Sequence, residues 1–372
     1  MAPSEKKKLN VLYLQPGTTI FAGVERVVDT ICTELAAHHG DDFAIDVLRV
    51  SQHHCYPPEP RRYNSLMRPA PSRLRLMRVF RQVIKDKRYD LVVVPQIDPA
   101  VIFWFARLGL KQPIAMHLHG NPSREDGHLK AKILFFLLRH VVLRRIASVF
   151  GTSPRQLETF KRLFNCDRPL FWVPNPVRVF EEPPLDHGRE SGLIRFVNVG
   201  RYDFQKGQDI LIDAFAKLYA RRKDIRLSLV GHGSDEAALA AQIQRLGLSD
   251  VVRLEHHPDN PQQALFASDV FVATSRWEGW SLAICEALRC GLPVVSTDCE
   301  FGPSDILVDP RLGRLVPPDD EAALVDAMNH YCDHIEQERA GADFRRTYID
   351  RYSVEKTAKI HADAIRASIA AA

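Results

Sequence analysis

The fold is decided by Arg276-Trp277-Glu278-Gly279-Trp280-Ser281-Leu282-Ala283-Ile284-Cys285-Glu286-Ala287-Leu288-Arg289-Cys290-Gly291. An apolar run at 270–273 precedes this stretch and is typical of a buried strand. The stretch itself predicts a helix that Gly291 and Pro293 terminate. The N-terminus of such a helix presents unbonded backbone N–H groups and about half a positive charge to an anion. We therefore predict a strand-to-helix turn that holds a diphosphate.

Two glutamates have distinct places in this stretch. Glu278 lies in the loop before the predicted helix, and Glu286 falls in its second turn. An ionised carboxylate only accepts hydrogen bonds, and its two oxygens suit a pair of sugar hydroxyls. Two diols joined by a diphosphate describe a nucleotide sugar. The alternative is that both glutamates are solvated or salt-bridged surface residues.

Short apolar runs alternate with helical patterns along the whole chain, as in parallel sheets joined by crossover helices. The first half predicts strands at 10–14, 44–50, 91–95, 114–118, 148–151 and 170–173. The second half predicts strands at 195–199, 227–230, 252–254, 270–273, 294–296 and 313–316. We predict an α/β protein of two doubly wound, Rossmann-like domains facing a cleft, because such sheets bind ligands beyond the carboxyl ends of their strands.

A polar, breaker-rich stretch at 177–191 predicts the linker between these domains. The N-terminal, acceptor-side domain is placed at 1–185 and the C-terminal, nucleotide-sugar-binding domain at 186–352. A last helical pattern within 353–372 has the apolar residues to pack back on the N-terminal domain.

Composition narrows the class of protein. No apolar stretch reaches the roughly 18 residues of a membrane span, and the start of the chain lacks a signal-peptide pattern, which predicts a cytoplasmic protein. The seven cysteines are widely spaced without a zinc or redox motif and predict free thiols. Residues 1–185 hold 28 Lys and Arg against 17 Asp and Glu, a net +11, while the rest of the chain is acidic. This asymmetry predicts an anionic partner for the first half.

The residues from Arg276 to Leu307 resemble glycosyltransferase family four of the retaining GT-B enzymes. The mark of that family is two glutamates separated by seven residues and followed by Ala-Leu/Met-x-x-Gly-x-Pro-Val-Val/Ile. The matching residues are Glu278, Glu286, Ala287, Leu288, Gly291, Pro293, Val294 and Val295. The resemblance implies that Glu278 lies by the donor sugar and that Glu286 binds the nucleotide ribose. It also places the turn residues against the donor: Gly279, Trp280, Ser281 and Leu282.

A second element, Gly200-Arg201-Tyr202-Asp203-Phe204-Gln205-Lys206-Gly207, matches the Gly-Arg-x-x-x-x-Lys-Gly pattern of the same family. It follows the first strand of the second domain. Arg201 and Lys206 are expected to neutralise the diphosphate as it leaves, where a charge-assisted hydrogen bond contributes roughly 1.5–3 kcal/mol. Solvated side chains are the alternative for both cations.

Several further positions follow predicted strands and are tied to the donor by the resemblance. Gly23 matches the second glycine of a Gly-Gly loop, with Ala22 in place of the first. Strand alternation puts His117 and His119 on one face, and His119 matches a family histidine at the donor sugar. Plain turns or structural roles are the alternatives. The remaining positions that the resemblance assigns to the donor are Asn175, Gly231 and Gly233. His256 is also assigned to the donor, but it stands where the family usually has a glycine, which leaves the base open.

No Asp-x-Asp motif occurs in the chain, so we expect no metal and no cofactor beyond the donor itself. Two basic and apolar runs, at 73–81 and 130–145, predict amphipathic helices that contact anionic lipid peripherally. A core-facing stripe with a solvated basic face is the alternative for each run. Nucleic acid is not expected, since no recognised binding motif accompanies these bases.

Together these features predict a retaining, metal-independent glycosyltransferase. It moves a hexosyl group from a UDP- or GDP-sugar to a lipid-linked saccharide in lipopolysaccharide or exopolysaccharide synthesis, at the cytosolic face of the inner membrane. The run Ser296-Thr297-Asp298-Cys299-Glu300-Phe301-Gly302-Pro303 resembles those of surface-polysaccharide enzymes. The alternatives are a catalytically inactive nucleotide-sugar-binding protein and a sugar-nucleotide epimerase. The base, the sugar and the acceptor stay open.

Overall fold

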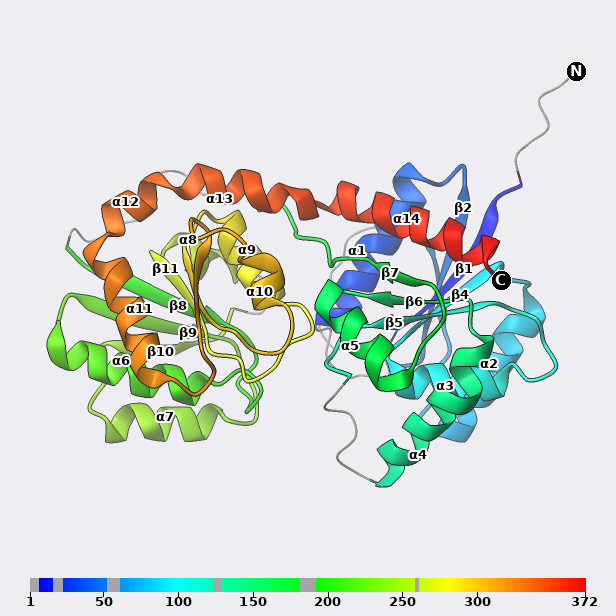
Figure 1. The fold of residues 1–372 in the computed structure, drawn as a ribbon, viewed down its shortest axis with the longest axis horizontal. Coiled ribbons are helices and arrows are strands. Elements are labelled where there is room, and N and C mark those ends of the chain that lie inside the picture. The colour runs from blue at the N-terminus through cyan, green and yellow to red at the C-terminus, as the bar shows by residue number, and fades with distance from the viewer. Residues whose placement is uncertain (1–6, 16–22, 52–60, 123–128, 181–191, 258–260) are drawn as a thin grey trace, which may run out of the picture. The chain divides into compact units, whose positions relative to one another are not determined.

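A computed structural model describes residues 7–15, 23–51, 61–122, 129–180, 192–257 and 261–372. The chain divides into two compact units, each built on one parallel sheet flanked by helices (Figure 1). The first unit combines Met1–Pro176 with Val354–Ala372, and the second is Val177–Ser353. The predicted α/β class with two Rossmann-like domains is confirmed.

The first unit holds a seven-stranded parallel sheet in the order β3-β2-β1-β4-β5-β6-β7. Its strands are β1 (Leu9–Leu14), β2 (Phe43–Arg49), β3 (Asn64–Met67), β4 (Leu91–Pro95), β5 (Ile114–Leu118), β6 (Ser148–Gly151) and β7 (Leu170–Trp172). Chain order reverses between β1 and β4, which pair directly with Val11 opposite Leu91. Such a reversal is the switch point of a doubly wound sheet.

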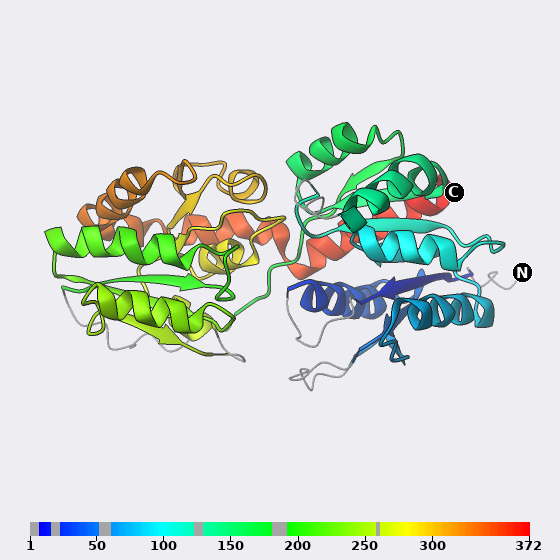
Figure 2. The ribbon, with the colours of Figure 1, turned by 90° about the horizontal axis from the view of Figure 1, so that it is seen from below.

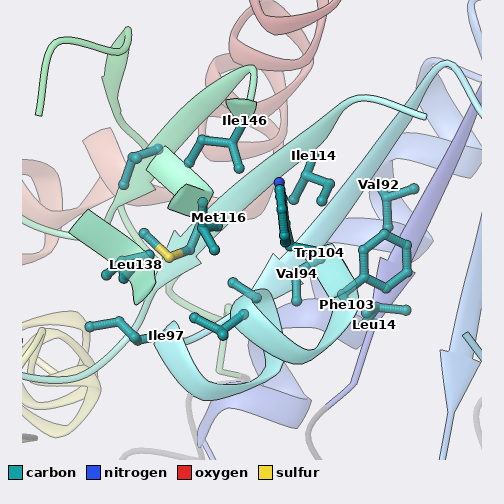
Figure 3. Close-up of a cluster of buried hydrophobic side chains, with 14 of the residues drawn as sticks. Leu14, Val92, Val94, Ile97, Phe103, Trp104, Ile114, Met116, Leu138 and Ile146 are labelled. Carbon is teal, nitrogen blue, oxygen red and sulfur yellow. The ribbon is translucent and has the colours of Figure 1, made fainter. Parts of the chain in front are cut away.

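Alternate residues of β5 show how the two faces of this sheet are covered. Ile114, Met116 and Leu118 belong to a core cluster with the helices α2 (Arg73–Asp86), α3 (Ile97–Ala106) and α5 (Pro154–Phe164). Figure 3 shows Phe103 and Trp104 of α3 in this cluster. His117 instead faces α14 (Val354–Ala370), which also packs against α1 (Gly23–His38). The C-terminal helix is thus an integral part of the first unit.

The predicted helix at 130–145 changes type along its length. It begins as α4 (Leu129–Leu137), continues as a π-helical turn (Leu138–Val142) and ends as a 3₁₀ turn (Leu143–Arg145). Leu138 and Val142 are fully buried in the core of the first unit. A π-helical turn inserts one extra residue per turn, and here it accompanies the burial of these two side chains.

The second unit holds a six-stranded parallel sheet in the order β10-β9-β8-β11-β12-β13. Its strands are β8 (Ile194–Val199), β9 (Ile225–Val230), β10 (Val252–Glu255), β11 (Val270–Ala273), β12 (Val294–Thr297) and β13 (Gly313–Val316). Chain order reverses between β8 and β11, so this unit repeats the doubly wound plan of the first. Figure 2 gives a second view of both sheets.

Helices cover both faces of the second sheet. One core cluster joins the sheet to α6 (Gln208–Arg221), α7 (Glu236–Arg245) and α11 (Glu321–Asp333). A second cluster joins it to α8 (Gln262–Phe266), α9 (Leu282–Arg289), α10 (Pro303–Ile306) and α13 (Ala342–Ile349). The short helix α12 (Ile335–Ala340) and a 3₁₀ turn (Asp350–Tyr352) complete the unit. None of the described helices is both long and apolar enough to cross a membrane.

All twelve predicted strands are present, with ends that differ by at most two residues. The structure adds β3, an edge strand that the sequence did not predict. Its residues Asn64, Ser65 and Met67 are exposed, so the strand lacks the apolar alternation that would identify it. Among the described strands, it pairs with β2 alone.

Candidate functional site

The loops after β8 and β11 form the centre of the candidate site. The first runs from Gly200 to Gly207 and the second from Thr274 to Ser281. Because β8 and β11 are hydrogen-bonded neighbours where chain order reverses, both loops lie at the switch point, where doubly wound sheets bind ligands. The structure therefore brings Lys206 and Glu278, predicted from separate motifs, to one edge of one sheet.

Hydrogen bonds to backbone carbonyl groups join these two loops. Thr274 Oγ1 donates a hydrogen bond to Gly207 O at 2.7 Å, and Arg276 N donates to Gln205 O at 2.8 Å. Gly207 has a φ of +65°, and a Cβ there would lie 2.1 Å from Thr274 O. Only glycine fits such a close approach without movement. The relative position of the loops is therefore set by backbone packing.

Lys206 and Glu278 form the central ion pair of the site. Lys206 Nζ lies 2.6 Å from Glu278 Oε1, and Ser275 Oγ donates to the same oxygen at 2.8 Å. The side chain of Glu278 is only 6% exposed and that of Lys206 20%, so water screens the pair weakly. Among the described residues, none bonds to Oε2 of Glu278. One carboxylate oxygen is thus fixed and the other is left as an acceptor.

Arg201, the other predicted cation, is placed differently from Lys206. Its side chain is 58% exposed, and its guanidinium lies 3.0 Å from Asp203 Oδ2 and donates to Gln205 Oε1 at 3.3 Å. An exposed pair of this kind contributes little to stability. Arg201 is therefore held loosely on the surface of its own loop.

The predicted Gly231–Gly233 turn packs on the loop after β8. A Cβ on Gly231 would lie 1.9 Å from Gly200 O, and one on Gly233 would lie 2.2 Å from Tyr202 O. The exposed rings of His232 and His256 lie 4.7 Å apart at the ends of β9 and β10. Three neighbouring strand ends thus contribute to one continuous edge.

The helix predicted from the opening stretch is α9, which begins at Leu282. Ser281 precedes it, but its side chain makes no capping hydrogen bond, so the first-turn N–H groups are left for another partner. Gly291 follows the helix with a φ of +83°, the left-handed conformation of a glycine C-cap. The predicted helix is confirmed, with Glu278 in the loop before it and Gly291 after its end.

Glu286 lies in the second turn of α9, as predicted, and carries an ion pair that the sequence did not reveal. Arg178 Nη2 donates to Glu286 Oε1 at 3.1 Å, and the Glu286 side chain is only 8% exposed. Arg178 falls in the stretch predicted as a linker, 108 positions away in the chain. No local pattern marks such a long-range partner.

The turn between Glu278 and α9 is held in place by packing against Tyr352 and Gly302. The Trp280 ring is buried in the core and packs edge-on against Tyr352, with ring centroids 5.1 Å apart. Gly302, at a φ of +91°, lies so close that a Cβ there would be 3.2 Å from Ser281 N. Gly279 and Ser281 are buried and Leu282 is half-buried. The turn therefore offers backbone groups and Glu278, while the Trp280 side chain serves packing.

In the first unit, the predicted positions follow different strands. Gly23 is exposed and begins α1, while Phe21 and Ala22 lie outside the described residues. Asn175 follows β7 and is buried, and its Oδ1 has no hydrogen-bond partner in the described part of the chain. A buried polar atom of this kind is normally satisfied by water or a ligand.

His117 lies in β5 and His119 directly follows that strand, and their ring centroids are 3.9 Å apart, as expected for two residues on one face. His361 of α14, which the sequence did not single out, completes the group at 5.5 Å from His117. Burial lowers the pKa of His119 and of His361 to about 3 and holds the pKa of His117 well below its usual value. All three rings are therefore neutral near pH 7.

The described residues include no group of three or more His, Cys, Asp or Glu arranged to hold a metal ion. The six described cysteines are free and buried, and Cys55 lies outside the described residues. Cys285 and Cys290 are buried packing residues, as predicted. Burial, with Glu278 as a second cause, raises the pKa of the Cys299 thiol to about 12. This thiol is therefore protonated and a poor nucleophile.

Both parts of the chain match glycosyltransferase family models. Residues 22–176 match the model described as "Glycosyl transferase 4-like domain", and residues 194–334 match "Glycosyl transferases group 1".

Curated relatives match shorter stretches. The chain is 30% identical over 185 residues to lipopolysaccharide 1,6-galactosyltransferase of Escherichia coli (strain K12), covering 48% of this chain and 51% of that protein. It is 33% identical over 213 residues to the lipopolysaccharide core biosynthesis mannosyltransferase LpsB of Rhizobium meliloti (strain 1021), covering 52% and 57%. The matches thus span little more than half the length of these relatives.

A solved structure is similar over nearly the whole chain. HepE from Anabaena, in complex with UDP and glucose, superposes with a TM-score of 0.82 at 18% identity, covering 96% of this chain and 99% of that one. Such identity shows the fold alone. With two doubly wound units and a glycosyltransferase family model matching each, the chain belongs to the GT-B glycosyltransferases.

Proposed function

We propose that this protein transfers a hexosyl group from a nucleoside-diphosphate sugar to a lipid-linked saccharide, with retention of anomeric configuration and without a metal ion. The observation that carries the proposal is the Lys206–Glu278 ion pair, 2.6 Å long, at the switch point of the second sheet and beside the uncapped start of α9. A cation, a helix N-terminus and a carboxylate with one unbonded oxygen are the groups that a diphosphate and its attached sugar need.

The charged and polar residues at this edge of the second sheet each have a role in this proposal. The first-turn N–H groups of α9 and the Lys206 ammonium stabilise the diphosphate as negative charge grows on the leaving group. Glu278 accepts from hydroxyls of the donor sugar through Oε2, and Glu286 accepts from the ribose. The exposed Arg201 reaches the phosphates from its loop. His232 and His256, at the ends of β9 and β10, are assigned to contact with the nucleotide base of the donor.

The two carboxylates of the candidate site are engaged by cations, which supports transfer without a metal ion. Glu278 and Glu286 are each already bonded to a cation, Lys206 or Arg178. A carboxylate engaged in this way is a poor ligand for Mg²⁺, which requires near-ideal oxygen geometry. The positive charges that would accompany a metal are supplied instead by side chains and by the helix end.

We propose retention of anomeric configuration because neither Glu278 nor Cys299 is suited to attack the donor sugar. The Glu278 carboxylate is held by Lys206 and Ser275, so it orients the sugar instead of attacking it. The Cys299 thiol, with a pKa raised to about 12, is protonated. Attack on the same face that the phosphate leaves, assisted by that phosphate, is the proposed route.

The acceptor is proposed from the relatives and from charge. Two curated relatives are named for lipopolysaccharide synthesis, and another, from Campylobacter jejuni, is named for a transfer to a diphospho-undecaprenol-linked sugar. The first half of this chain carries the +11 net charge. A polyanionic or diphosphate-linked glycolipid is therefore the class of acceptor that fits.

Contact with the membrane is part of the proposal. Leu74 on α2 is 71% exposed, and Ile133 and Phe136 on α4 are 54% and 61% exposed. Both helices pack against α3. Their flanking bases are Arg73, Arg75, Arg78, Lys132 and Arg139. Exposed apolar side chains ringed by bases suit an anionic lipid surface, where each base contributes about 1 kcal/mol.

The experiment is to incubate the purified protein with UDP- and GDP-sugars and to follow nucleotide release with and without a bacterial membrane extract. The proposal predicts release from at least one donor that accelerates when the extract is added. Donor binding without release would instead indicate a catalytically inactive binding protein. Release from no donor under any condition contradicts the transferase proposal.

A further inference from the structure

Among the described residues, Arg178 is the one cation bonded to the second motif glutamate, and no sequence motif accounts for it. We propose that Arg178 is a positioning residue: it holds the Glu286 carboxylate turned so that this carboxylate accepts hydrogen bonds from the ribose of the donor. The inference rests on the proposed nucleotide-sugar function and adds a residue to it.

The geometry of the pair leaves one oxygen for a ligand. Arg178 Nη2 donates to Glu286 Oε1 at 3.1 Å. In the part of the chain that the structure describes, no other side chain bonds to this carboxylate. Arg178 therefore fixes one oxygen of the Glu286 carboxylate and leaves the other as an acceptor for a ribose hydroxyl.

Both partners are fixed by their surroundings. Val177, the residue before Arg178, is fully buried, and its N–H donates to Tyr352 O at 2.8 Å. The Arg178 guanidinium lies 5.4 Å from the centroid of the Phe180 ring. On the other side, the neighbours of Glu286 on α9, Cys285 and Ala287, are fully buried. The backbone that carries each partner is therefore held in place, which suits a positioning role.

The pair also repeats the arrangement at the first glutamate. Lys206 bonds to Oε1 of Glu278, and Arg178 bonds to Oε1 of Glu286, while among the described residues nothing bonds to either Oε2. At both motif glutamates, one carboxylate oxygen bonds to a cation and the other stays available as an acceptor. This repetition is not expected of salt bridges that only stabilise the fold. The planar guanidinium is more selective than an ammonium for the direction of the carboxylate.

The test is equilibrium binding of nucleoside diphosphates to the full chain, measured by calorimetry with UDP, GDP and their 2′,3′-dideoxy forms. Wild type should bind the ribonucleotide more tightly than its dideoxy form. Arg178→Ala should weaken ribonucleotide binding by roughly tenfold, the effect of losing about one well-placed hydrogen bond, and should reduce the preference for ribose. Arg178→Lys should restore part of both.

Two further variants separate positioning from other roles. Glu286→Gln should mimic Arg178→Ala, and the double variant should bind no more weakly than Glu286→Gln alone, because the arginine acts through the glutamate. Arg289→Ala is the matched control, since Arg289 also lies on α9 and pairs with Asp350 at 3.3 Å. It should leave nucleotide affinity unchanged. If Arg178→Ala does not fold, Arg178→Gln takes its place.

The inference is overturned if the arginine variants keep the wild-type preference for ribose over dideoxyribose. It is equally overturned if Arg178→Ala and Glu286→Gln weaken binding multiplicatively, since Arg178 would then contact the ligand by itself. If wild type binds no nucleoside diphosphate at all, the proposed function fails, and this inference fails with it. The first two results leave the proposed function intact, so the failures are distinguishable.

Discussion

Lys206 Nζ lies 2.6 Å from Glu278 Oε1 and so connects the loops of two strands, β8 and β11, where the second sheet reverses its strand order. The two residues come from motifs that are separated by 72 positions. Their ion pair is shielded from water, because the Glu278 side chain is 6% exposed. Removing either partner would leave the other charge buried and uncompensated.

Lys206→Ala is expected to lower kcat/KM for the donor roughly 10–100-fold, as one charge-assisted hydrogen bond of about 1.5–3 kcal/mol is lost from the departing phosphate. The measurement is the initial rate of nucleotide release. Lys217→Ala is the control, because Lys217 forms an exposed pair with Glu321 at 2.7 Å on the neighbouring helix α6. An unchanged rate for Lys206→Ala would show that its charge plays no part in transfer.

Gly207→Ala is expected to displace the loop after β8, because its Cβ would lie 2.1 Å from Thr274 O. Gly247 provides the matched control: it has the same φ of +65°, but a Cβ there meets nothing within 4 Å. Gly247→Ala should cost only the left-handed strain of about 1–2 kcal/mol, measured as the free energy of unfolding in urea. Gly207→Ala should cost more and should also weaken nucleotide binding. Equal stability losses in the two variants would contradict the close packing of the loops.

Stability should depend on pH through the histidine group of the first unit. Burial lowers the pKa of His119 and His361 to about 3 in the folded chain, against about 6.5 when unfolded. Between these values the unfolded chain binds more protons, so the stabilisation is present above pH 6.5 and is lost as the pH falls toward 3. Each such histidine contributes up to about 1.4 kcal/mol per pH unit in that window.

His361→Phe removes one of these titrations. The difference in unfolding free energy between pH 7 and pH 5 should therefore be about 2 kcal/mol smaller in the variant than in wild type. Comparing each protein with itself at two pH values cancels any change in packing. An identical pH dependence in both proteins would show that the His361 ring is solvated in the folded chain.

Binding to anionic liposomes should depend on the exposed apolar residues of α4. Phe136→Ser should reduce sedimentation with vesicles that contain phosphatidylglycerol, and addition of salt should reduce it further, because the flanking bases are screened. Val308→Ser is the control, since Val308 is 62% exposed and Phe136 61%, but Val308 lies in the second unit. Absence of wild-type binding at low salt would remove membrane contact from the proposal.

The fold could be predicted because buried parallel strands are short, continuous apolar runs, as in Leu91–Pro95 and Val270–Ala273, whose predicted bounds match the structure. The edge strand β3 could not, because three of its four residues are exposed. The end of α9 followed from the local signals Gly291 and Pro293, and Gly291 has the left-handed conformation of a glycine C-cap.

The partners of the site residues could not be predicted in the same way. Arg178 and His361 reach Glu286 and His117 only through tertiary packing, and neither lies in a periodic or motif position. Likewise, sequence spacing suggested that Lys206 and Arg201 act alike. Burial separates them, since Lys206 is paired with Glu278 at the switch point while Arg201 is exposed.

The central claim is that the loops around α9 in the second unit bind the nucleotide of the donor. Calorimetric titration of UDP and GDP into wild type, Glu286→Ala and the exposed control Glu236→Ala tests it most directly. The account predicts one nucleotide bound per chain by wild type and by Glu236→Ala, and affinity at least about tenfold weaker in Glu286→Ala. Binding of equal strength in all three proteins, or no binding of either nucleotide to wild type, would contradict it.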